Sequence, residues 1–285
     1  MGKHLLALGF GFSAQTLARD LQAEGWTITG TSRRKRRHPG VNIVEWPGTD
    51  LAPALTEATH VLSSVPPRAE CDPAFDLLAG AVGRMPRLEW VGLLSTTGVY
   101  GDHGGAWVDE DTPLVLRDHR GGLRAAQDAA WMTLHHDHGL PVHRFRLAGI
   151  YGHGRSALDK MRDGTARRIV KPGQMFSRIH VEDIAQTLRA SIERPNPGRA
   201  YNLADDLPGP PQDVIAYAAE LLNLPIPPDI DFETAELSPM ARSFYADNKR
   251  VRNQRIKDEL GVTLRYPDYR VGLRAILAAE ANTPG

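Results

Sequence analysis

Residues 9–14 read Gly-Phe-Gly-Phe-Ser-Ala and fit the fingerprint G-x-G-x-x-G/A. The apolar run from His4 to Leu8 precedes them and predicts a buried strand. Apolar residues at helical spacing follow, and Gly25 ends the predicted helix. The fingerprint is weak by itself. Between a strand and a helix, however, it predicts a turn that receives the diphosphate of a dinucleotide.

Each position of this fingerprint has a physical role in such a turn. Gly9 permits the tight turn, Gly11 lets the backbone approach a diphosphate, and Ala14 allows close packing of helix on strand. Phe12 and Ser13 open the helix, where free N–H groups and the positive end of the dipole favour phosphate. The alternative is an ordinary glycine-rich turn without a ligand.

The end of the second predicted strand, 26–31, indicates which dinucleotide is bound. Enzymes that prefer NAD carry a carboxylate about 20 residues after the glycine motif. This sequence has no acid there. Thr31 and Ser32 can donate hydrogen bonds, and Arg33 can pair with a 2′-phosphate through its planar fork. NADP is therefore expected rather than NAD. The alternative for residues 33–37 is a solvated basic turn, and we favour it for Lys35, Arg36 and Arg37.

Strand-like runs alternate with amphipathic stretches through the first two-thirds of the chain. This alternation predicts an α/β fold, a Rossmann-type doubly wound parallel sheet with a small C-terminal substrate lobe. We expect residues 1–150 and about 176–204 in the NADP-binding domain, and about 151–175 with 205–285 in the lobe and C-terminal helices. The predicted strands are 4–8, 26–31, 41–46, 61–65, 90–95 and 142–148. Ser64 and Val65, which end the fourth of them, are expected beside the cofactor.

Composition excludes several classes of protein. The 34 basic and 34 acidic residues cancel, so no global field attracts nucleic acid or an anionic membrane. The single cysteine, Cys71, excludes a disulfide-built secreted fold. No stretch approaches the roughly 18 apolar residues of a membrane span. We therefore expect a cytoplasmic protein with no nucleic-acid or membrane partner, and a homodimer remains open.

Four segments together resemble the extended short-chain dehydrogenase/reductase family, also called the NAD-dependent epimerase/dehydratase family. They cover about 175 residues in the order that the family shows. The segments are the glycine motif at Gly9, residues 94–101 (Leu-Ser-Thr-Thr-Gly-Val-Tyr-Gly), residues 146–155 (Arg-Leu-Ala-Gly-Ile-Tyr-Gly-His-Gly-Arg) and residues 178–185 (Arg-Ile-His-Val-Glu-Asp-Ile-Ala).

The resemblance implies a catalytic site at the nicotinamide, built from a hydroxyl residue and a Tyr-x-x-x-Lys pair. Thr96 stands where the family has its hydroxyl residue, but residues 101–150 contain neither tyrosine nor lysine. The best match puts Arg120 at the tyrosine position and Arg124 at the lysine position. Arginine stays protonated, so Arg120 is a poor acid/base catalyst. The two arginines could hold a ribose or an anionic substrate, or lie on a surface helix without a ligand.

Other polar residues were weighed as site candidates. Tyr151, at a strand end, is the tentative substitute phenol, whereas packing is favoured for Tyr100. Asp183 and its neighbour His180 are given structural roles. The histidines at 135, 136 and 138 are read as a solvated helix end, and no metal site is expected. Candidates for binding phosphate or carboxylate in the C-terminal part are Arg155, Arg178, Arg242, Asn248 and Arg250.

The sequence thus predicts an NAD(P)-binding, atypical reductase or epimerase-like enzyme acting on a small polar metabolite. Thr96 would polarise the substrate, and Tyr151 or water would move the proton. The missing acid/base pair leaves a second hypothesis open, a non-catalytic NADP(H) sensor or scaffold. A third, weaker hypothesis is an anion-binding protein without a dinucleotide.

Overall fold

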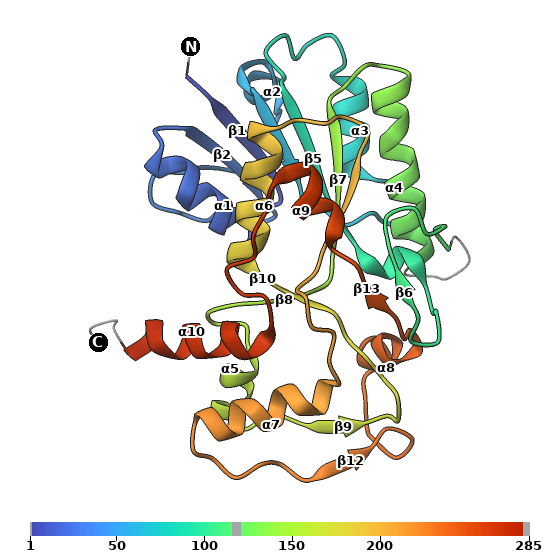
Figure 1. The fold of residues 1–285 in the computed structure, drawn as a ribbon. Helices are drawn as coiled ribbons and strands as arrows, with labels where there is room; N and C mark the ends of the chain where they lie inside the picture. Colours follow the sequence, from blue (N-terminus) through green and yellow to red (C-terminus); the bar gives the residue numbers. More distant parts are fainter. Residues whose placement is uncertain (1, 116–120, 282–285) are drawn as a thin grey trace.

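A seven-stranded, fully parallel sheet forms the centre of the chain (Figure 1). The computed structural model describes residues 2–115 and 121–281. In spatial order the strands are β11 (Ala200–Leu203), β7 (Val142–Leu147), β5 (Trp90–Thr96), β4 (His60–Ser63), β1 (His4–Leu8), β2 (Thr27–Ser32) and β3 (Asn42–Glu45). The strand order reverses next to β1, as in doubly wound folds. The predicted fold class is confirmed: this is a Rossmann-like α/β fold.

Helices cover both faces of the sheet, and each face has its own apolar cluster. One cluster includes Leu17 and Leu188, and the other includes Leu78 and Trp131. Both clusters draw on alternate residues of the central strands, which explains why those strands are apolar throughout. On the first face lie α1 (Phe12–Ala23), α6 (Val181–Glu193) and α9 (Gln254–Leu260), and on the second α2 (Ala52–Glu57), α3 (Pro73–Gly80) and α4 (Gly121–His136).

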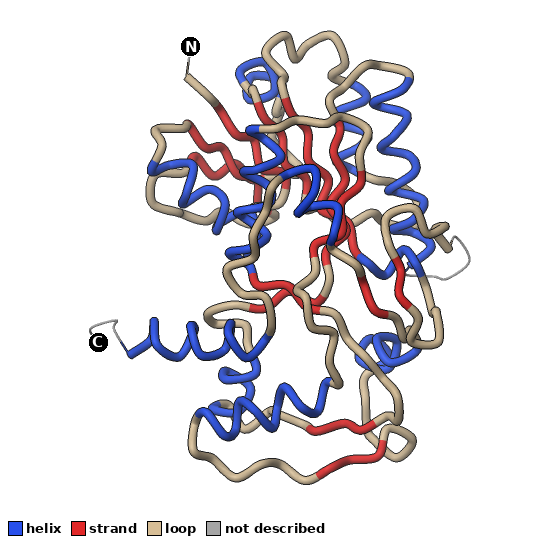
Figure 2. Tube along the Cα trace, viewed as in Figure 1, coloured by secondary structure: helices blue, strands red, loops and turns tan. Residues whose placement is uncertain are grey.

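A smaller lobe lies beyond the carboxyl ends of the strands (Figures 1 and 2). Two clusters fill it, one around Leu158 and Leu273 and the other around Ile169 and Phe232. Its elements are β8 (Gly149–Tyr151) paired with β10 (Arg178–His180), β9 (Arg168–Val170) paired with β12 (Asp229–Asp231), and helices α5 (Ala157–Arg162), α7 (Pro211–Leu221), α8 (Pro239–Ala246) and α10 (Tyr269–Ala281).

The structure differs from the expected division at one stretch. Val251, Ile256 and Leu264 pack in the first cluster of the sheet domain, although residues 205–285 were all assigned with the lobe and the C-terminal helices. This stretch includes α9, whose apolar side covers β11. Strand β13 (Arg250–Val251) pairs with β6 (Trp107–Val108) beside it. The density of prolines predicted the lobe. It did not indicate that the chain packs against the sheet domain again around α9.

The strand register brings the site candidates to one edge of the sheet. Leu8, Ser63 and Leu93 stand in one row across β1, β4 and β5, and Thr96 lies three residues further along β5. Neighbouring strands are about 4.8 Å apart. The carboxyl ends of β1 and β5 are therefore separated by roughly 10 Å, with β4 between them. This is the edge at which open α/β sheets bind their ligands.

Across residues 2–115 and 121–281, no helix combines the length and the apolar character that crossing a bilayer requires.

Candidate functional site

The glycine turn after β1 is held from two sides. The Gly9 amide donates to Thr31 Oγ1 at 2.8 Å, and Ser64 Oγ donates to the Gly9 carbonyl at 2.6 Å. Gly9 has a φ of +82°, where side chains are strained, and a Cβ there would lie 2.7 Å from Ser64 Oγ. Only glycine fits this position, so the turn is rigid before any ligand arrives.

The first amides of α1 have no acceptor within the part of the chain that the structure describes. Phe12, Ser13 and Ala14 donate to no carbonyl or side chain there, whereas Gln15 begins the helical pattern by donating to the Gly11 carbonyl at 2.9 Å. Ser13 and Ala14 are also buried. A Cβ on Gly11 would have no atom within 4 Å apart from its own chain neighbours. The turn thus combines donors that have no acceptor among the described residues with open space at Gly11, which fits a diphosphate.

Two predicted cofactor ligands prove to support the turn. Thr31 is 1% exposed, and its hydroxyl oxygen accepts the Gly9 amide. The Ser64 hydroxyl is likewise engaged with Gly9, and Val65 lies against the same glycine. Because the Thr31 side chain is buried, its observed role is to hold the glycine turn, and a direct contact with a cofactor stays a prediction.

A pocket of about 170 Å³ opens beside this turn, between the start of α1 and the end of β2. Its wall is basic because Arg36 and Arg37 face it. Arg33, the residue chosen from sequence, is exposed and does not line it. The lining residues are Phe10, Gln15, Ser32, Arg36, Arg37, His38 and Ile43. The sequence interpretation had assigned Arg36 and Arg37 to solvent, since spacing in an irregular loop does not reveal which side chains turn back.

Thr96 ends β5 and caps the following 3₁₀ helix, η1 (Thr97–Tyr100). Its Oγ1 accepts the Gly98 amide at 3.1 Å, which leaves the hydroxyl proton to be donated elsewhere. Helix α4 runs alongside, and the guanidinium of Arg124 donates to the Leu94 carbonyl at 2.6 Å. Arg124 therefore reaches the strand that carries Thr96. Arg120 lies outside the described residues.

Beneath Thr96 lies a buried ionic network. Asp128 on α4 is fully buried and accepts from Arg144 at 2.8 Å and from Arg146 at 2.9 Å. Arg146 also donates to the Tyr100 hydroxyl at 2.9 Å, and that hydroxyl donates to Asn202 Oδ1 at 2.7 Å. The network joins α4, β7, η1 and β11. The packing role favoured for Tyr100 agrees with these contacts.

Tyr151 is not presented to the cleft as expected. Its side chain belongs to a lobe cluster, and its hydroxyl lies 3.4 Å from the Asp268 carbonyl. Burial raises the pKa of Tyr151 well above the usual range. A Cβ on Gly272 would collide with this phenol, so α10 packs directly on it. The tentative catalytic role is corrected to packing, because the hydroxyl is enclosed and its pKa is raised.

The fourth family-like segment is structural at two positions. His180 caps α6 by accepting the Glu182 amide at 3.2 Å, and burial lowers its pKa to about 4. Asp183 accepts the amides of Arg265 and Tyr266 at 2.7 and 3.0 Å. It therefore anchors the segment that leads back from α9 to the lobe. Spacing indicated a structural role but not this distant partner.

One buried acid, Asp205, was not predicted from the sequence as a neighbour of Arg178. Asp205 follows β11, is 1% exposed, and lies near the Arg178 guanidinium. Burial raises the pKa of Asp205 to about 8, and the charge of Arg178 opposes that rise. Arg178 donates to the carbonyls of Phe176 and Gly209 at 2.9 and 3.1 Å. The pair joins the sheet domain to the lobe, and nothing in the local pattern predicts it.

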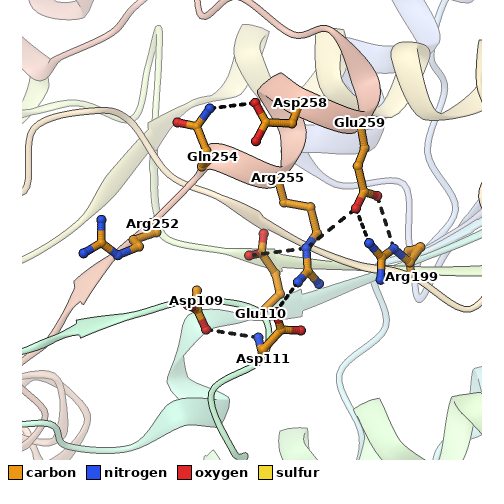
Figure 3. A pocket seen from close by; sticks show the side chains of 9 residues that line it. All are labelled: Asp109, Glu110, Asp111, Arg199, Arg252, Gln254, Arg255, Asp258 and Glu259. Carbon is orange, nitrogen blue, oxygen red and sulfur yellow. Dashed lines mark hydrogen bonds and ion pairs between the residues drawn. The ribbon is translucent and has the colours of Figure 1, made fainter.

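A second pocket, of about 270 Å³, lies away from the glycine turn and beside α9 (Figure 3). Its charges pair among themselves. Arg255 lies 2.7 Å from Asp111, and Arg199 pairs with Glu259. Its lining residues are Asp109, Glu110, Asp111, Arg199, Arg252, Gln254, Arg255, Asp258 and Glu259. Because most of its arginine charge is neutralised internally, we assign no ligand to it.

Comparison with known proteins places the chain among relatives of the same fold. A protein of unknown function from Silicibacter pomeroyi DSS is 53% identical, with a TM-score of 0.90, over 97% of this chain and 99% of that one. The chain belongs to that protein's family. Protein YeeZ of Escherichia coli K12 is 27% identical over 304 residues, covering 93% of this chain and 97% of YeeZ. No protein-family model matches the chain.

The structural neighbours are proteins of the NAD-dependent epimerase/dehydratase family. A Methylobacillus flagellatus protein provisionally assigned to that family is 26% identical, with a TM-score of 0.71, over 99% of both chains. A dTDP-glucose 4,6-dehydratase from Bacillus anthracis, in complex with NAD, has a TM-score of 0.77 at 17% identity over 99% of this chain and 97% of its own, and shows the fold alone. These structural neighbours are thus of the family that the four sequence segments resemble.

Proposed function

We propose that the chain binds NADP(H) on the glycine turn and acts as an atypical oxidoreductase or epimerase-like enzyme. The observation that carries the proposal is the set of three amides at Phe12, Ser13 and Ala14, which have no acceptor within the described ranges and open space in front of Gly11. A diphosphate supplies acceptors for all of them. The neighbours solved with NAD share this fold, which supports dinucleotide binding as such but does not bear on the choice of NADP.

The preference for NADP rests on the basic pocket at the end of β2. Arg36 and Arg37 line it beside Ser32, and no carboxylate stands among its lining residues. A 2′-phosphate on the adenosine ribose would meet two guanidinium groups there, whereas the two hydroxyls of NAD would meet no acid. Arg33 belongs to the same loop, but it is exposed and does not line the pocket.

Thr96 would orient the substrate. Its hydroxyl accepts from Gly98 and has its proton available for a substrate carbonyl or hydroxyl. The bound cofactor would supply or accept a hydride at this position. Since Tyr151 is enclosed, water is the proton source that we propose. The substrate that we propose is a small polar metabolite, which enters between the sheet edge and the lobe.

Turnover distinguishes this proposal from its rival. NADPH oxidation across a panel of small carbonyl metabolites, followed at 340 nm, should show at least one substrate whose turnover falls at least tenfold in Thr96→Val. Protein lacking any turnover with the panel, in spite of tight NADPH binding, would contradict the enzymatic part of the proposal.

The second candidate is a sensor of the NADPH/NADP⁺ ratio without catalysis. It is favoured by two contacts: Arg124 is engaged with the Leu94 carbonyl, and Tyr151 is enclosed in the lobe. Neither residue can then exchange a proton with a substrate. A sensor should bind the reduced and oxidised cofactors with clearly different affinities in calorimetry. Equal affinities together with no turnover would exclude it.

A further inference from the structure

A tight turn from the lobe lies against the start of α1. Gly152 and Arg155 exchange backbone hydrogen bonds of 3.2 and 3.0 Å, and Gly154 between them has a φ of +71°. A Cβ on Gly152 would come within 2.7 Å of Val181 and 3.0 Å of the Phe12 ring. The turn is therefore seated directly on the first residue of α1, and this close seating requires glycine.

This seating presents one cation to the helix start. The Arg155 guanidinium carbon lies 5.9 Å from the centroid of the Phe12 ring. Arg155 is exposed, and its side chain forms no hydrogen bond or ion pair with any residue in the ranges 2–115 and 121–281. Arg162 of the same lobe, in contrast, pairs with Glu280 at 2.6 Å. Arg155 is therefore a cation on a fixed backbone whose guanidinium has no acceptor within these ranges.

We propose that Arg155 is a diphosphate-binding residue that closes over the dinucleotide from the side of the lobe. The inference rests on the proposed function and adds a binding residue to it. Phe12 carries one of the unsatisfied amides and also touches the Arg155 turn, so the guanidinium lies beside the start of α1, next to Gly11 and its open space. The amides face one side of a diphosphate, and the guanidinium neutralises its charge from the opposite side.

This arrangement divides the recognition of the cofactor between two parts of the fold. The glycine turn and the Arg36/Arg37 pocket belong to the sheet domain, whereas Arg155 stands at the entrance to the lobe. Loss of Arg155 should therefore lower the affinity for ligands in proportion to the phosphate charge that they place at α1. Recognition of the adenosine 2′-phosphate should not change.

The test compares two ligands on four proteins. NADPH carries the diphosphate, whereas adenosine 2′-monophosphate keeps the 2′-phosphate and has no diphosphate. Calorimetric titrations of both would be made on wild type, Arg155→Gln, Arg155→Lys and the control Lys160→Gln. Lys160 is an exposed cation of the same lobe on α5. Thermal melting checks that the variants fold, and the melting temperature should not change because the Arg155 side chain makes no hydrogen bond or ion pair within the described residues.

The expected result is that Arg155→Gln weakens NADPH binding about tenfold and Arg155→Lys by less than that. Binding of adenosine 2′-monophosphate should change less than twofold in every variant, as should NADPH binding by Lys160→Gln. Equal NADPH affinities in wild type and Arg155→Gln would overturn this inference while leaving the proposed function intact. An equal loss for both ligands would also overturn it. Wild type that binds neither NADPH nor NADH would instead overturn the proposed function.

Discussion

The carboxyl ends of β1 and β5 lie at the same edge of the sheet, yet they differ in how their polar groups are satisfied. After β1, three amides have no acceptor within the described parts of the chain, and there is open space at Gly11. After β5, Arg124, Tyr100 and Asp128 are all engaged in contacts inside the protein. An unsatisfied donor calls for a ligand, whereas a satisfied one stabilises the fold. The first end is thus built for binding and the second mainly for stability.

The largest effect should come from breaking the satisfied end. Asp128→Ala leaves Arg144 and Arg146 buried without their counter-charge, and we expect a loss of about 3–5 kcal/mol in the free energy of unfolding. Urea unfolding followed by circular dichroism measures it. Asp137→Ala, at an exposed acid just past the end of α4, should cost less than about 0.5 kcal/mol. Similar values for the two variants would show that the network is not what holds α4.

A replacement at the carboxyl end of β1 should lower the affinity for NADPH and leave the stability of the fold unchanged. Gly11→Val fills the open space where a diphosphate would approach, and Gly11 has a φ of −97° that a side chain tolerates. We expect NADPH affinity to fall about 100-fold, or roughly 3 kcal/mol, because the backbone approach is blocked. The melting temperature should stay within about 2 °C of wild type. Unchanged affinity would mean that the ligand, if any, does not pass Gly11.

These two ends also differ in how far the sequence could predict them. The glycine turn follows from a local pattern, since strand, motif and helix are contiguous, and the predicted fold class is correct for the same reason. The Asp128 network joins residues from four separate segments, so no spacing rule reveals it. Tyr151 carried a strand-end signal, but its enclosure depends on α10, which is more than 100 residues away. The Arg36 and Arg37 side chains line the pocket from an irregular loop. Such a loop has no periodic pattern from which the direction of a side chain could be predicted.

At the opposite edge of the sheet, near the amino ends of β4 and β7, we expect the stability of the fold to depend on pH. His60 and His143 are buried there beside Trp90, and burial lowers the pKa of each to about 4. The unfolded chain takes up these protons near pH 6.5 and the folded chain near pH 4, so stability is lost as pH falls through this range. At pH 5 the loss should be about 2 kcal/mol for each histidine.

Urea titrations at pH 7 and pH 5 measure this effect, and His60→Phe should reduce the difference between the two pH values. NADPH affinity should be insensitive to the same replacement, because the edge lies away from the glycine turn. A stability that is equal at pH 7 and pH 5 would show that these rings are not held neutral.

The smallest effects are expected from single arginine replacements in the pocket beside the glycine turn. Arg36→Ala and Arg37→Ala should each weaken NADPH binding by about 1.5 kcal/mol through loss of a charge-assisted contact. NADH binding should not change. Arg33→Ala serves as the matched control, since Arg33 is exposed and outside the pocket lining, and its effect should stay below about 0.5 kcal/mol. A larger loss of NADPH affinity in Arg33→Ala than in Arg36→Ala and Arg37→Ala would show that Arg33 binds the 2′-phosphate.

Direct titration of the wild-type protein with NADPH and NADH by calorimetry bears most closely on the central claim. The unsatisfied amides and the basic pocket predict saturable binding of both nucleotides, with NADPH the tighter by at least tenfold. Absence of measurable heat with either nucleotide at millimolar concentration would contradict the claim that the glycine turn is a dinucleotide site.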